Sequence, residues 1–154
     1  MQVNTRFSLD INLSDIVHFN NLSKTFKLEG TNDSTDKIIV LYMYILPDFP
    51  THGIKVGMTT CRPNETFKHA IKKRIDEQEH ELALDPERYK KYGSNREVIY
   101  WGVCLDAKNE SFKDYAVHKE IVLEEAGIQE KEQEWFTNVP VDELIRIVQK
   151  IRSR

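Results

Sequence analysis

The sequence contains no apolar stretch that approaches the ~20 residues of a membrane-spanning helix. Its N-terminus also lacks the apolar core of a secretory signal peptide. We therefore expect a cytoplasmic protein with no membrane partner. Cysteine is scarce too, because the sequence has only Cys61 and Cys104, which form no metal-ligand pattern. A disulfide between them could form, but two reduced thiols are the simpler expectation for a cytosolic protein.

Positive charge is the next shortage. The net charge is −3, whereas nucleic-acid-binding domains are usually basic. Two short basic clusters nevertheless occur, and acidic residues concentrate in 120–134. Such a run is often only the solvated face of a helix, so it indicates nucleic-acid binding only if other features agree. The first cluster comprises Lys68, His69, Lys72, Lys73 and Arg74, and the second comprises Arg88, Lys90, Lys91 and Arg96.

The chain length fits one domain. A chain of 154 residues buries about two-thirds of its unfolded surface, so it needs neither a metal nor a disulfide in order to fold. Residues 1–36 form an N-terminal appendage whose role the sequence leaves open, and within it residues 30–36 (GTNDSTD) predict a polar linker. Residues 37–154 form the main domain.

Three apolar segments predict strands. Residues 37–46 (KIIVLYMYIL) are apolar on both faces, which suits a buried central strand. Residues 53–59 (GIKVGMT) follow a turn rich in proline and glycine, so the two segments should pair as a hairpin. Residues 97–106 (EVIYWGVCLD) predict the third strand. The resulting fold is α/β, with a small three-stranded, mostly antiparallel sheet flanked by helices.

The helices are predicted from apolar residues at helical spacing and from start and stop signals. The last helix has no stop signal before the end of the chain, so it could fray at a natural terminus or continue in a longer protein. The three helices cover residues 65–84, capped by Asn64; residues 112–126, capped by Ser111 and stopped by Gly127; and residues from near Pro140 to the end.

Three features stand out against these elements: a tyrosine pair, a lysine and an arginine. Tyr42 and Tyr44 share one face of the first strand, because side chains alternate along a strand. Lys55 interrupts an apolar strand, and Arg74 lies at the edge of the apolar face of its helix. Taken singly, each has an ordinary explanation: an aromatic core, a lysine whose charged end reaches water, and an arginine at a helix edge.

Taken in order, these segments resemble the GIY-YIG nucleases. Tyr42-Met43-Tyr44 stands at the first signature, with Tyr44 matching its tyrosine, and Lys55-Val56-Gly57 stands at the second, eleven residues later. Lys73-Arg74-Ile75 matches the arginine segment of the helix that follows. The chain departs from the family pattern at Tyr42 and Gln78, and also at Lys55, which replaces the second signature tyrosine as in a branch with some restriction enzymes.

The distal half is similar to GIY-YIG domains that accompany helicase-like and phage-defence proteins. The matching segments are residues 112–119 (FKDYAVHK), Gly127 and residues 134–136 (EWF), so the resemblance covers about residues 37–137. Asp114 occupies the position of the metal carboxylate, where much of the superfamily has glutamate. His118 lies one turn later on the same helix face.

The resemblance implies an endonuclease that uses Mg²⁺ or Mn²⁺ to hydrolyse DNA, as a module of a larger restriction, repair or phage-defence enzyme. It implies that Asp114 holds the metal, that Arg74 clamps the phosphate, and that Tyr44 and Lys55 act on the attacking water. His118 and Glu134 are further candidates at the catalytic centre. The candidates for contact with DNA are Lys72, Lys73 and Gln78.

Two alternatives stay open. A GIY-YIG-like domain could bind nucleic acid without cutting it, since Gln78 and Asp114 depart from the commonest pattern. A protein-interaction module would fit the acidic net charge. The sequence leaves open the choice between DNA and RNA, and it leaves open the oligomeric state.

Overall fold

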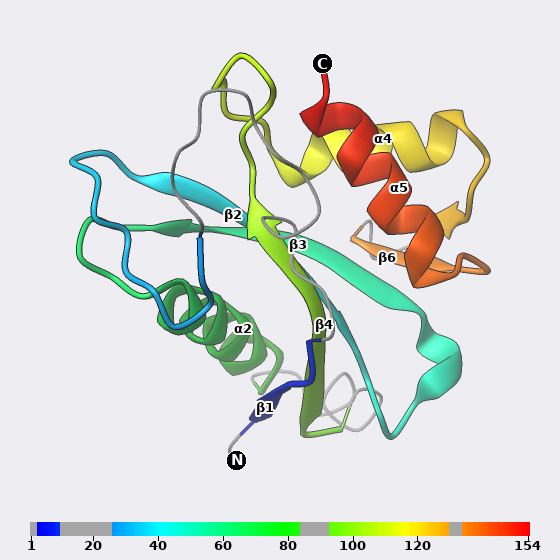
Figure 1. The fold of residues 1–154 in the computed structure, drawn as a ribbon. Coiled ribbons are helices and arrows are strands. Elements are labelled where there is room, and N and C mark those ends of the chain that lie inside the picture. Colours follow the sequence, from blue (N-terminus) through cyan, green and yellow to red (C-terminus); the bar gives the residue numbers. More distant parts are fainter. Residues whose placement is uncertain (1–2, 10–25, 84–92, 130–133) are drawn as a thin grey trace.

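The computed structural model describes residues 3–9, 26–83, 93–129 and 134–154. These residues form a six-stranded mixed sheet with helices on both faces (Figure 1). The prediction of a small three-stranded, mostly antiparallel sheet is therefore wrong. The strands lie in the order β1-β4-β2-β3-β6-β5 and comprise β1 (Asn4–Phe7), β2 (Ile38–Ile45), β3 (Ile54–Cys61), β4 (Asn95–Val103), β5 (Ile128–Gln129) and β6 (Trp135–Thr137).

The three predicted strands form the centre of this larger sheet. β2 pairs antiparallel with both β3 and β4, and residues 40–44 of β2 are at most 1% exposed. Burial on both faces explains why this strand is apolar without alternation. The sequence missed the three outer strands for different reasons. β5 and β6 have two and three residues, too few for a periodic pattern, and β1 pairs parallel with β4 from within the N-terminal segment.

In the part of the chain that the structure describes, three α-helices cover the sheet: α2 (Phe67–Ala83), α4 (Asp114–Leu123) and α5 (Val141–Arg152). Two of the predicted N-caps are wrong. Thr66 caps α2, because its hydroxyl accepts the His69 N–H at 3.1 Å, while Asn64 adopts a left-handed turn with φ of 67°. α4 begins at Asp114, after Lys113, and no side chain caps it. Pro140 precedes α5 as predicted.

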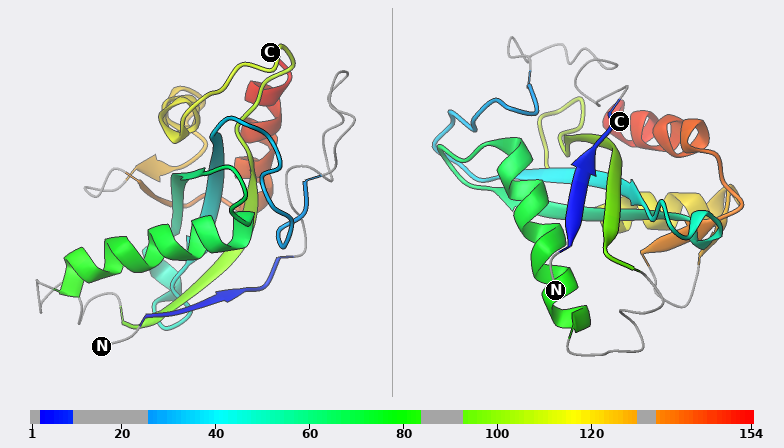
Figure 2. Two further views of the ribbon diagram at one scale, coloured as in Figure 1. Left: turned by 90° about the vertical axis from the view of Figure 1, so that its left-hand side faces the viewer. Right: turned by 90° about the horizontal axis from the view of Figure 1, so that it is seen from below.

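The two faces of the sheet carry separate cores. α2 packs on one face, against aromatic side chains that include Tyr42, Tyr44, Trp101 and Trp135. α4 and α5 pack on the other face, against an aliphatic cluster, so that the sheet lies between α2 and the α4–α5 pair (Figure 2). Cys61 and Cys104 belong to opposite cores and are free thiols, as expected. No helix in the described residues has the length and apolarity needed to cross a membrane.

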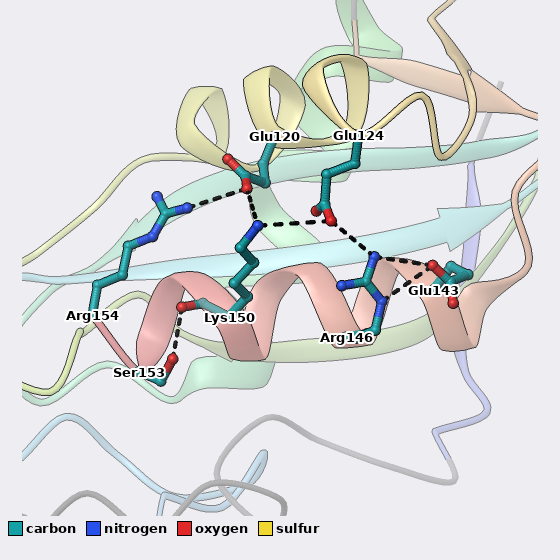
Figure 3. Close-up of polar contacts among 7 residues, drawn as sticks. All are labelled: Glu120, Glu124, Glu143, Arg146, Lys150, Ser153 and Arg154. Atoms are coloured by element: carbon teal, nitrogen blue, oxygen red, sulfur yellow. Dashed lines mark hydrogen bonds and ion pairs between the residues drawn. The ribbon is translucent and has the colours of Figure 1, made fainter.

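Ion pairs join α4 to α5 on their outer side (Figure 3). Lys150 lies 2.7 Å from Glu120, and Arg146 lies 3.2 Å from Glu124. Arg154, just after α5, is 3.2 Å from the same Glu120 carboxylate. We call these residues, together with Glu143, the α4–α5 ion-pair cluster. They link the outer side of α5 to α4, the helix that carries two of the predicted site residues.

Candidate active site

The hairpin register sets two tyrosines against β3. Tyr44 pairs with Lys55, and Tyr42 pairs with Gly57. The two rings stack with their centroids 6.1 Å apart and an interplanar angle of 13°. A Cβ atom at position 57 would lie 2.8 Å from the Tyr42 ring, so glycine is what lets this ring lie across the neighbouring strand. The local sequence therefore builds an aromatic floor on the α2 face of the sheet.

α2 places polar groups over this floor. The Gln78 Oε1 atom accepts hydrogen bonds from Lys55 Nζ at 3.0 Å and from the Tyr42 hydroxyl at 3.2 Å. Arg74 lies one turn earlier on the same helix, and its positive charge acts on Tyr42. The Arg74 side chain is 41% exposed and lies 4.0 Å from Glu77. It can therefore reach solvent or a bound anion without leaving the helix.

The chain that enters β6 closes the other side of Lys55. Glu134 forms an ion pair with Lys55 at 3.2 Å. Trp135 meets the Tyr44 ring edge-on, with centroids 5.4 Å apart. The Lys55 ammonium also lies 5.6 Å from the centre of the Tyr44 ring. Lys55 is only 8% exposed. An amide, a carboxylate and an aromatic ring therefore hold its side chain in one orientation.

α4 contributes Asp114 and His118, each 8% exposed. His118 Nε2 lies 2.7 Å from the Val56 carbonyl oxygen, and because a carbonyl can only accept, this nitrogen carries the proton. Burial raises the pKa of Asp114; His118 and Lys55 lower it, and the negative charge of Glu134 raises it further. Residues from α4, β3 and the start of β6 therefore share one electrostatic environment.

The pKa of Tyr42, on the α2 side, is affected by several of the same residues. Burial raises the pKa of its phenol well above the ordinary value, and Glu134 and Asp114 add to that shift, whereas Arg74 opposes it. The phenol therefore stays protonated and serves as a hydrogen-bond donor to Gln78. Sequence analysis assigned Tyr42 no role of its own, although its position on the same face as Tyr44 indicated that it would lie near the site.

The structure thus brings together most of the residues predicted for the site. It separates Lys72 from them, because Lys72 pairs with Asp76 at 2.9 Å, and Asp76 also accepts a hydrogen bond from Thr5 of β1. This side of α2 faces β1, at the far end of the sheet from β6. The gathered residues are Tyr44, Lys55, Arg74, Gln78, Asp114, His118 and Glu134.

Lys73 lies in a different place from Lys72. It lines a groove of about 420 Å³ between α2 and the C-terminal half of β3, and the groove also includes Arg74. The second basic cluster contributes nothing that can be placed there, since Arg88, Lys90 and Lys91 lie outside the described residues and Arg96 is 1% exposed in the core.

The donor set at this site suits Mg²⁺ or Mn²⁺. The negative charge of Glu134 raises the pKa of Asp114, so the two carboxylates repel each other, and a cation bound near both would relieve that repulsion. Magnesium is commonly held by one or two carboxylates, with water and substrate phosphate filling the remaining positions. Among the described residues, no group of three or more histidine, cysteine or acidic side chains could hold a metal alone. The protein part of such a site would therefore be small.

One curated protein is similar to this chain over most of both lengths. It is the "Putative type II restriction enzyme and methyltransferase RM.MpnORF109P N-terminus" of Mycoplasma pneumoniae, 34% identical over 116 residues. The match covers 73% of this chain and 68% of that protein. No protein-family model matches the chain, and no solved structure matches it significantly.

Proposed function

The chain belongs to the family of this Mycoplasma pneumoniae restriction protein, and on that premise we propose that it is a DNA-cleaving module of the restriction type. We infer further that it hydrolyses phosphodiester bonds in the manner of the GIY-YIG nucleases, with Mg²⁺ or Mn²⁺. The observation that carries the proposal is that Lys55, Arg74 and Asp114 come from three separate elements and lie within electrostatic reach of Tyr42 or of one another.

Arg74 is the group proposed to bind the scissile phosphate. A phosphodiester repels nucleophiles because it is negatively charged, so hydrolysis needs that charge to be neutralised as it grows on the phosphate oxygens. The planar guanidinium of Arg74 can donate two parallel hydrogen bonds to such oxygens. Arg74 is partly exposed and its contact with Glu77 is long, at 4.0 Å, so it can exchange Glu77 for a phosphate group.

Tyr44 and Lys55 are proposed to position the attacking water. The water oxygen forms the new bond to phosphorus and releases a proton to solvent, while the bond to the leaving sugar oxygen breaks and that oxygen takes up a proton. Tyr44 and Lys55 face each other across the hairpin, and Lys55 is fixed by Gln78 and Glu134. A lysine held in this way can donate to the water or to the phosphate without losing further side-chain entropy.

Asp114 and Glu134 are the residues proposed to hold the divalent cation. When bound, the cation would neutralise negative charge on the phosphate oxygens and activate water. Asp114 must lose its proton before it can act as a ligand, and its raised pKa makes that step sensitive to pH. His118 holds α4 against β3 through the Val56 carbonyl and thereby positions Asp114.

The module is proposed to work within a larger enzyme. The name of the Mycoplasma pneumoniae relative pairs a restriction activity with a methyltransferase. A single site of this kind cuts one strand, so cleavage of a duplex would require two copies or two successive visits. We propose restriction as the context, and we leave the target sequence to experiment.

The test is cleavage by the purified chain. A large phage genome and a supercoiled plasmid offer many target sequences, and each is incubated with Mg²⁺, Mn²⁺ or EDTA. We expect nicked or cut DNA only with metal, from the native chain and from Lys72→Ala, but not from Arg74→Ala. DNA binding by the native chain without cleavage under any metal condition would favour the non-catalytic alternative.

A further inference from the structure

We propose that the groove between α2 and β3 holds one strand of the DNA backbone next to the scissile phosphate. The groove is defined by its cationic lining residues Lys37, Arg62, Lys73 and Arg74, together with Thr59 and Thr60 of β3. The inference rests on the proposed function, because it assigns the path of that enzyme's substrate. Lys73 and Arg74 are already candidates for DNA contact, and the groove adds Lys37, Arg62 and the β3 threonines to them.

The charge of the groove is the first argument. The protein as a whole carries a net charge of −3, yet the groove has four cations against only two lining carboxylates, Glu65 and Glu77. Glu65 is engaged locally, because its side chain accepts the Arg62 N–H at 3.0 Å and contacts His69 at 2.8 Å. A local excess of positive charge on an acidic protein is suited to a polyanion such as the DNA backbone.

The position of the groove is the second argument. Arg74 belongs both to the groove and to the candidate active site, so the two are continuous. β6 pairs only with Ile54 and Lys55, and in the described part of the chain no strand covers the remainder of that edge of β3. Thr59 shares the α2 face of β3 with Lys55, because side chains alternate along a strand, so its hydroxyl is on the side where it could donate to a phosphate oxygen.

The length of β3 sets the reach. Thr59 is four residues beyond Lys55, which at about 3.3 Å per residue corresponds to roughly 13 Å along the strand. DNA carries one phosphate per about 3.4 Å of helix axis on each strand. The groove should therefore contact phosphates within about four nucleotides of the cut, on one side only.

α2 offers a matched pair of variants for the test. Lys72 and Lys73 are neighbours of equal charge, but Lys73 lines the groove whereas Lys72 pairs with Asp76 on the β1 side of the helix. Binding of a fluorescent DNA duplex is measured in EDTA over a range of salt concentrations. We expect Lys73→Gln to weaken binding and to lower the slope of log K against log salt by about 1, and Arg62→Gln to act similarly. Lys72→Gln should leave both quantities unchanged.

A second measurement locates the contact on the DNA. A methylphosphonate removes the charge of one phosphate and is placed at successive positions on either side of the cleavage position. For the native chain, we expect weaker binding only when the substitution lies within about four nucleotides on one side. In Lys73→Gln the loss at the contacted position should shrink, because the partner charge is already gone.

The possible outcomes distinguish a failure of this inference from a failure of the proposed function. Equal effects of Lys72→Gln and Lys73→Gln, or no effect of Lys73→Gln, would overturn the groove while leaving cleavage intact. Groove-dependent binding by a chain that never cuts DNA would overturn the proposed function and support the groove. A native chain that binds no DNA at any salt concentration would overturn both.

Discussion

The two faces of the sheet use charge in different ways. On the α2 face, Lys55 is almost fully buried. It donates to Gln78, which also binds Tyr42, and it forms an ion pair with the Glu134 carboxylate. On the other face, the cations of the α4–α5 ion-pair cluster are roughly half exposed. Exposed ion pairs contribute little individually and are screened by salt, whereas buried charges are costly unless every partner is in place. The first arrangement suits a reaction site, and the second suits the attachment of one helix to another.

The largest expected effect of a single substitution is at Asp114. Asp114→Asn should abolish cleavage at every Mg²⁺ or Mn²⁺ concentration, because the amide keeps the shape but loses the charge. The same change should stabilise the fold near neutral pH. The raised pKa means that between the ordinary aspartate pKa and the raised value the folded state binds more protons than the unfolded state, so the native stability falls as pH rises through that window.

Thermal unfolding of Asp114→Asn and the native chain at several pH values checks this. The advantage of the variant should disappear as the pH falls below the ordinary aspartate pKa of about 3.9. Asp142→Asn is the matched control, because Asp142 is an exposed carboxylate in the first turn of α5. It should lower stability slightly at neutral pH through the helix dipole. If Asp114→Asn is also destabilised at neutral pH, burial of the Asp114 carboxylate does not lower the free energy of unfolding as we infer.

Arg74 gives the next largest effect. Arg74→Ala should lower single-turnover cleavage by about 100-fold to 1,000-fold, the usual loss when one charged donor to a transition state is removed. Its thermal midpoint should remain close to that of the native chain, because the side chain is 41% exposed and its ion pair with Glu77 is long, at 4.0 Å. Lys72→Ala, on the same helix, should change neither quantity. Native-like cleavage by a folded Arg74→Ala would remove Arg74 from the catalytic centre.

A substitution at Lys55 tests whether the buried charge on the α2 face serves the reaction. Lys55→Met keeps the apolar stem but loses the bonds to Gln78 and Glu134. We expect cleavage to fall by roughly 10-fold to 100-fold, as when a partner of a metal-site residue is removed. Lys119→Met, at an exposed position of α4, serves as the control. Full cleavage by Lys55→Met, together with instability of Lys55→Ala, would instead identify Lys55 as a packing residue.

The smallest effect is expected in the α4–α5 ion-pair cluster. Lys150→Ala removes contacts to Glu120 and Glu124, but Arg154 and Arg146 keep those carboxylates paired. The hydrogen bond from Lys150 lowers the pKa of Glu120, so the contribution of this pair is present above the ordinary glutamate pKa and is lost as pH falls through the lowered value. We expect a small drop in the thermal midpoint that high salt abolishes, with cleavage unchanged. A large loss of cleavage would show that α4 depends on this attachment to position Asp114.

Part of the fold was accessible from sequence. The apolar segments of β2, β3 and β4 were long enough for their patterns to show, and Pro140 marked the start of α5. The cap of α2 was misassigned because Asn64 and Thr66 are both good capping residues, and only the backbone conformation distinguishes them. The short outer strands form because neighbouring strands offer hydrogen-bonding edges, which no local pattern reveals.

The candidate site divides in the same way. The sequence by itself determined which residue types stand at which spacing, so Tyr44, Lys55 and Arg74 could be singled out from alternation along a strand and from helical spacing. Only the tertiary structure decided that Gln78 bridges Lys55 to Tyr42, that Glu134 comes from the edge of β6 to pair with Lys55, and that Lys72 and Lys73 face opposite ways. These contacts join residues that lie from about twenty to eighty positions apart. Their geometry depends on strand order and on which face of the sheet each helix covers, and neither is encoded in any single segment of the chain.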